Sequence, residues 1–126
     1  MKQLLLILLL CLSVDVVAQT VYKDKKQDLR LERVIQNSQP VYKVFFKSNY
    51  LLLGNKALTE MYLEEMLNVI ATEKTVMTYI GNTSVKLEYK DEVVVVHAQS
   101  SSFRLTKKQI VKIKEKLYSY SLDKIK

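Results

Sequence analysis

Two kinds of hydrophobic pattern follow each other along this chain. Residues 41–46, 50–53, 75–80, 84–89 and 93–96 are rich in β-branched and aromatic side chains and predict about five antiparallel strands. The expected turns between neighbouring strands are Ser48-Asn49, Gly81-Asn82 and residues 90–92. Residues 93–96 are four valines with no polar residue alternating among them, which indicates a central strand covered on both faces.

Two other stretches have apolar residues at helical spacing. The first begins near Thr59, has glutamates on its outer face, and has the inward positions Leu63, Met66, Leu67 and Ile70. The second opens with Thr106-Lys107-Lys108-Gln109, which matches a capping box, a motif that satisfies free amides at a helix start. Its inward positions are Ile110, Ile113 and Leu117. Both stretches predict amphipathic helices.

The remaining segments are polar. Residues 19–39 keep neither period for long, and we expect an N-terminal polar segment that forms a short helix with a frayed start and ends before Pro40. Residues 99–102 contain three serines and are expected to form a loop.

Together these elements predict a single α+β domain over residues 40–126. Its expected architecture is an antiparallel sheet of about five strands with two amphipathic helices packed on one face. The stretch from Tyr42 to Met66 resembles the one from Val85 to Ile113, since each has two strands and then a helix. This likeness suggests a ββα pseudo-duplication, although any hairpin followed by an amphipathic helix would align in the same way.

Residues 1–18 have the pattern of a secretory signal peptide. Lys2 gives a positive start, residues 4–12 form an apolar run, and a small-residue cleavage site ends at Ala18. The run is too short to span a bilayer, so we expect an exported product without a transmembrane segment after cleavage. Lipidation of Cys11 is the alternative, although the large Leu10 before it does not suit that modification.

Cys11 is the only cysteine, so the predicted mature domain has no disulfide, thiol nucleophile or thiolate metal ligand. An exported domain without disulfides is more typical of a bacterial envelope than of animal secretion, which predicts a periplasmic or secreted bacterial protein. The only glycines, Gly54 and Gly81, cannot form a glycine-rich phosphate loop, and no motif predicts a cofactor.

The formal net charge of +7 is concentrated after residue 103. The last predicted helix carries a basic stripe, and its members are candidate contacts to an anion: Lys107, Lys108, Lys112, Lys114 and Lys116. Few arginines and no interleaved aromatic residues accompany them, which argues against nucleic acid and leaves acidic lipid, glycan or protein. The plainer interpretations are a solvated helix face and attraction to the acidic first helix.

The sheet face away from the helices is a second candidate surface. Phe45, Met77 and Tyr79 would lie there beside Lys43 and Lys86, and this is more apolar than a plain solvent face. Two interpretations are open: the N-terminal segment covers these three side chains, or they form a surface for a partner protein or for a second copy in a homodimer.

His97, the only histidine, is interpreted as a polar cap at the end of the valine strand. A small hydrolase that uses His97 with Ser100 to Ser102 is an alternative, and it needs a pocket with a carboxylate within hydrogen-bond reach of the imidazole. Because no catalytic motif is found, the leading prediction is a small exported, non-catalytic binding or interaction module of unknown partner. A further alternative is an envelope-surface protein attached to anionic lipid or glycan through the basic helix.

Overall fold

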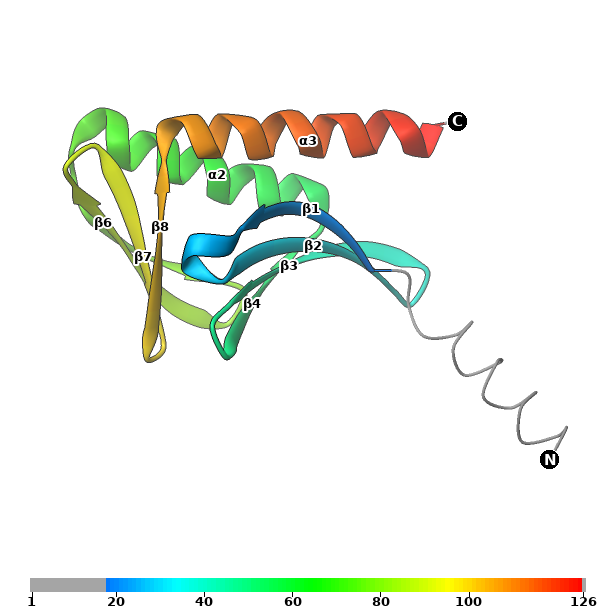
Figure 1. Ribbon diagram of the computed structural model, residues 1–126, viewed down its shortest axis with the longest axis horizontal. Coiled ribbons are helices and arrows are strands. Elements are labelled where there is room, and N and C mark those ends of the chain that lie inside the picture. Colours follow the sequence, from blue (N-terminus) through cyan, green and yellow to red (C-terminus); the bar gives the residue numbers. More distant parts are fainter. Residues whose placement is uncertain (1–17, 126) are drawn as a thin grey trace, which may run out of the picture.

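The computed structural model describes residues 18–125, with side chains as far as residue 119, and shows the element order ββββα twice in succession (Figure 1). The first unit consists of β1 (Ala18–Asp24), the 3-10 turn η1 (Lys25–Gln27), β2 (Leu29–Gln36), β3 (Gln39–Phe46), β4 (Asn49–Gly54) and α2 (Lys56–Thr72). The second consists of β5 (Val76–Ile80), β6 (Thr83–Lys90), β7 (Val93–Ala98), β8 (Ser101–Thr106) and α3 (Lys107–Ile125). The predicted leader, except for Ala18, lies outside the described residues.

The α+β class is confirmed, but the single sheet of about five strands is wrong. Each unit has its own four-stranded antiparallel meander, in the orders β1-β2-β3-β4 and β5-β6-β7-β8. The short helix expected within residues 19–39 is instead the hairpin of β1 and β2. A register shift between Thr20 and Tyr22 buries both Val21 and Tyr22, and this irregularity removes the alternation that would have revealed a strand.

The expected loop at residues 99–102 is also wrong. Only Gln99 and Ser100 form the turn, with Gln99 in the left-handed region at φ 57°, and β8 follows directly. Phe103 and Leu105 point into the core from β8. The structural repeat is therefore ββββα rather than the predicted ββα.

Both helices begin at side-chain caps. The Asn55 side chain accepts a hydrogen bond from the backbone amide of Leu58 (2.9 Å), so α2 starts at Lys56, three residues before the expected Thr59. The predicted capping box of α3 is confirmed, because Thr106 Oγ1 accepts from the Gln109 amide (3.1 Å) while Gln109 Oε1 accepts from the Thr106 amide (2.9 Å).

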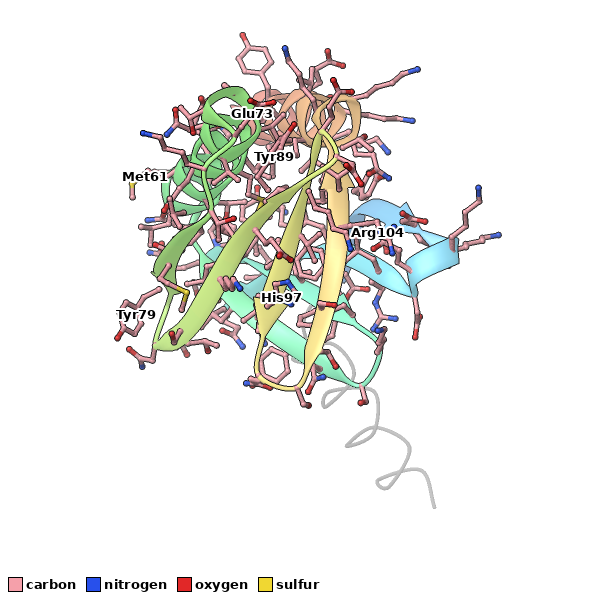
Figure 2. The ribbon with its side chains drawn as sticks, turned by 90° about the vertical axis from the view of Figure 1, so that its left-hand side faces the viewer. Met61, Glu73, Tyr79, Tyr89, His97 and Arg104 are labelled. Carbon is pink, nitrogen blue, oxygen red and sulfur yellow. The ribbon has the colours of Figure 1, made fainter. Side chains whose placement is uncertain are left out.

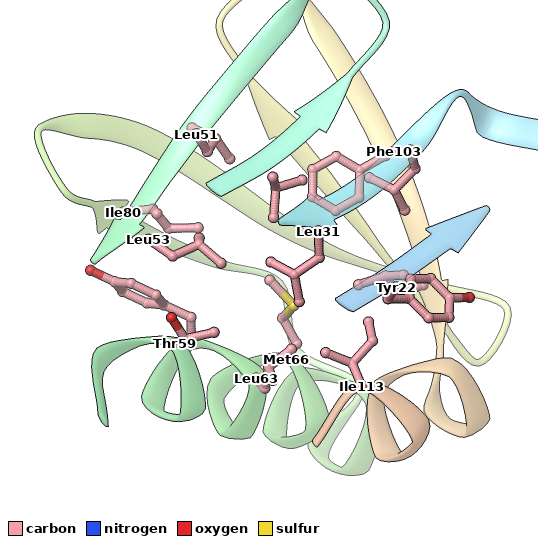
Figure 3. Close-up of a pocket in the computed structure, with 14 residues that line it drawn as sticks. Tyr22, Leu31, Leu51, Leu53, Thr59, Leu63, Met66, Ile80, Phe103 and Ile113 are labelled. Carbon is pink, nitrogen blue, oxygen red and sulfur yellow. The ribbon is translucent and has the colours of Figure 1, made fainter. Parts of the chain in front are cut away.

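The helices lie side by side over the inner faces of both sheets (Figure 1). The expected inward residues of the two helices are buried together: Leu63, Met66, Ile110, Ile113 and Leu117. Between sheets and helices remains an apolar cavity of about 30 Å³, lined by Leu31, Phe103 and others (Figure 3). This cavity has room for about one water molecule, so a binding site must be sought on the surface.

Candidate functional site

A groove of about 500 Å³ runs along the outer face of β6, β7 and β8, the face away from the helices (Figure 2). We call it the basic groove. Its lining consists of Lys26, Gln27, Lys47, Glu88, Lys90, Asp91, Val93, Val95, His97, Ser102, Phe103 and Arg104. These residues come from three strands of one sheet, from the turn between β6 and β7, from η1, and from the turn between β3 and β4.

Positive charge dominates the walls of the basic groove. Lys26, Lys47, Lys90 and Arg104 converge on it from four separate segments, whereas only two carboxylates line it. One of these, Glu88, is already bound to His97. Such a concentration of cations in a concave surface attracts anions more strongly than the same charges spread over a convex one.

The floor of the basic groove is aliphatic. Val93 and Val95 point outward from β7 and are half-buried. The expectation that the valine strand is central in its sheet is confirmed, since β7 lies between β6 and β8. The expectation that it is covered on both faces is wrong, because the helices cover only the inner face, with Val94 and Val96.

A polar network fixes η1 at the rim of the groove. The Gln27 side chain donates to the Arg104 carbonyl oxygen (2.7 Å) and accepts from the Arg104 amide (2.6 Å), as a neighbouring strand would. The Asp24 carboxylate accepts hydrogen bonds from the Lys26 amide (3.0 Å), the Gln27 side chain (2.9 Å) and the Gln109 side chain (3.2 Å). The first unit is thereby attached to both β8 and the start of α3.

This network alters the acidity of Asp24. The hydrogen bond from the Gln27 side chain is the main reason that the pKa of the Asp24 carboxyl lies below its ordinary value, and the amide of Lys26 and the side chain of Gln109 act in the same direction. The Asp24 carboxylate is therefore in its charged form when it accepts the hydrogen bonds that fix η1 at the rim of the groove.

His97 is paired across the sheet. Its Nε2 lies 2.9 Å from Oε1 of Glu88 on β6, and Ser102 is its direct partner on β8. The carboxylate and the pocket required by the hydrolase alternative are therefore present. Ser101 is engaged elsewhere, because its hydroxyl accepts a hydrogen bond from the Asn49 side chain (2.6 Å).

The pair of His97 and Glu88 lies at an open surface. The side chains of His97 and Glu88 are 41% and 36% exposed, so water reaches both and the local dielectric is high. The backbone amides of β7 are directed within the sheet toward β6 and β8. Within β7, no pair of amides is therefore aimed into the groove to stabilise an oxyanion. The hydrogen bond to His97 lowers the pKa of Glu88, as in a surface ion pair.

The predicted basic stripe on α3 is divided by its neighbours. Lys114 forms an ion pair with Glu64 of α2, and Lys116 lies over the Tyr22 ring, with Nζ 5.8 Å from the centroid. Lys107 and Lys108 border a hollow that also contains the acidic residues Glu73, Asp91 and Glu92. Of the five candidate lysines, only Lys112 neither interacts with one of these side chains nor borders the hollow in the described structure.

The predicted apolar face is also divided, between two sheets. Phe45 lies on the first sheet, where Arg30 stacks 4.7 Å from its ring centroid. Met77 and Tyr79 lie on β5, at the edge of the second sheet, and are 67% and 68% exposed. The structure therefore brings Met77 and Tyr79 together but separates Phe45 from them.

The described residues contain neither a metal-binding cluster nor a helix that could span a membrane. No group of three or more His, Cys, Asp or Glu side chains there could hold a metal ion. Within the same range, no helix is long and apolar enough to cross a membrane.

The basic groove was not expected from the sequence. Its cations lie at positions 26, 47, 90 and 104, far apart along the chain, and tertiary contacts such as the one between Gln27 of η1 and Arg104 of β8 bring them together. No protein-family model, no curated protein and no solved structure matches this chain. Its function must therefore be inferred from the site alone.

Proposed function

We propose that this chain is a small exported, non-catalytic binding module that takes an acidic segment of a partner protein in the basic groove. The observation that carries the proposal is the convergence of Lys26, Lys47, Lys90 and Arg104 on one concave surface. Only one of the two carboxylates that line it, Asp91, is not already paired with His97.

The floor of the groove favours a polypeptide over other polyanions. Val93 and Val95 offer aliphatic contacts, which suit the side chains of a peptide. Single-stranded nucleic acids bind to aromatic platforms on which bases stack, whereas Phe103, the aromatic residue among the described lining of this groove, has its side chain buried in the core.

The proposed compartment rests on the leader. A positive start, an apolar run and a small-residue site before Gln19 support export to the periplasm or secretion from a bacterium. Mass spectrometry of the exported protein tests this part separately, with Gln19 expected as the first residue. An intact Met1, or a lipid on Cys11, contradicts it.

Binding is tested with a fluorescent peptide of alternating glutamate and valine residues. Replacing Lys26, Lys47 and Lys90 together by Gln removes three exposed charges and leaves the core untouched. If each contact contributes about 0.5 kcal/mol, as exposed ion pairs do, the dissociation constant rises about tenfold. Its dependence on salt should become weaker as well.

The matched control removes the same charge from α3. Replacing Lys108, Lys112 and Lys116 by Gln should change peptide affinity less than about twofold, apart from a small effect of net charge. An equal loss of peptide affinity in the two variants would refute binding in the basic groove. The wild-type protein can also be tested on anionic vesicles and sulfated polysaccharide. If it binds them and only the α3 variant loses this binding, attachment to an envelope surface is favoured instead.

A further inference from the structure

The four outermost strands of the two sheets differ in how their free sides are protected. The side chain of Gln27 occupies the free side of β8 at Arg104. A bulge interrupts β1, which also packs against α3. On β4, the turn at Gly81 closely approaches the carbonyl oxygen of Leu52, since a Cβ on Gly81 would lie 3.2 Å from it.

In the described structure, the free side of the fourth edge, β5, is contacted only at its end, where Gly81 approaches Leu52 of β4 and donates its amide to the Tyr62 hydroxyl (3.3 Å). Among the described residues it is paired on one side only, with β6. The seven residues from Thr75 to Gly81 include no charged residue and no proline, the features with which proteins usually block pairing at an edge strand. Met77 and Tyr79 project from it and are about two-thirds exposed.

We propose that β5 pairs with β5 of a second copy of this chain. In an antiparallel register centred on Thr78, Met77 of each copy lies opposite Tyr79 of the other, and Val76 lies opposite Ile80. Methionine sulfur and an aromatic ring form a favourable cross-strand pair, and the symmetry supplies this pair twice. The strand is thus complementary to itself.

Electrostatic repulsion does not oppose this arrangement. The nearest cation on the outer face is Lys86, which neighbours Met77 on β6. In the dimer, the two β6 strands that carry Lys86 are three strand spacings apart, which is about 14 Å. This distance exceeds the Debye length of about 8 Å at physiological ionic strength. Beyond the paired segment, Lys74 of one copy points toward the uncharged turn Gly81-Asn82 of the other.

The proposal is tested by sedimentation analysis of the mature chain. A pair of five-residue strands makes a small interface, so we expect a reversible dimer with a dissociation constant on the order of 10 µM. Tyr79→Lys and Met77→Glu should each weaken the dimer at least tenfold. The matched control is Tyr118→Lys, at a position on α3 that is 63% exposed, and it should leave the dimer unchanged.

Mixing the two weakened variants tests the register. Lysine at position 79 of one copy then faces glutamate at position 77 of the other, while the second site keeps its native Met77 and Tyr79. The mixture should therefore form a heterodimer more stable than either variant forms alone. A wild-type chain that stays monomeric at 200 µM (about twenty times the expected dissociation constant), or a dimer weakened only by Tyr118→Lys, would overturn the proposal. Peptide binding in the groove is measured independently and is unaffected by either result.

Discussion

Truncation of Ile113 to alanine tests the packing that joins the two units. Ile113 is 3% exposed and lines the central cavity together with Tyr22, Leu31 and Met66. The change removes three carbon atoms, which is worth about 2.4 kcal/mol of transfer free energy at about 0.8 kcal/mol for each. The new space adjoins an existing cavity held open by two sheets and two helices, so it should not collapse, and a cavity penalty is added. We expect a total loss of about 3 to 4 kcal/mol.

Urea denaturation followed by circular dichroism measures this loss. The chain has no tryptophan, so tyrosine fluorescence is the second probe. With a denaturant slope of about 1.5 kcal/mol/M, the midpoint should fall by about 2 M at unchanged slope. The control is Val111→Ala on the outer side of the same helix, where the side chain is 38% exposed and the expected loss is below about 0.5 kcal/mol. A loss below about 1 kcal/mol for Ile113→Ala would refute the packing described above.

Three further predictions concern polar side chains. The pKa of Asp24 is lowered in the folded state. Its contribution to stability is therefore present above the unfolded pKa of about 4 and is lost as the pH falls through the lower folded value. Asp24→Asn should flatten the profile of stability against pH between about pH 5 and 3, as measured by acid titrations followed by circular dichroism. Thr106→Ala removes one bond of the capping box and should cost about 1 kcal/mol in urea denaturation, whereas Thr106→Ser should restore most of it. His97→Ala should leave the denaturation midpoint unchanged, because His97 is paired with Glu88 on an open surface. Any measured hydrolysis of ester substrates should also stay unchanged, whereas a loss of several hundred-fold would support the hydrolase alternative.

Much of the fold could be predicted where a single period continues without interruption. The capping box at Thr106 and the stripe from Ile110 to Leu117 required only local information, and both are present. The hairpin of β1 and β2 was missed because the bulge near Tyr22 places adjacent residues in the core. Two serines at the start of β8 conceal a strand whose burial depends on contacts distant in sequence, such as the one between the Phe46 and Phe103 rings (4.8 Å).

Local sequence patterns were equally insufficient to predict the candidate sites. A row of lysines on one helix is visible in the sequence, but the carboxylate of Glu64 and the ring of Tyr22, which engage two of them, are brought to α3 by tertiary structure. The basic groove has no sequence signature, because neighbours such as Gln27 and Arg104 are 77 positions apart. Local periodicity thus predicted both helices and five of the eight strands, whereas the groove depends on contacts between the two units.

The two proposals together predict a bivalent protein. Residues directly opposite each other in a sheet point to the same face, so pairing of β5 with its copy creates one eight-stranded sheet with both basic grooves on its outer side. A surface that carries acidic peptides at high density should bind such a dimer up to about a hundredfold more tightly than one peptide in solution does. Tyr79→Lys should abolish this gain in surface-binding measurements while it leaves the affinity for the soluble peptide unchanged. A gain that persists in this variant would show that the two grooves do not act together through β5.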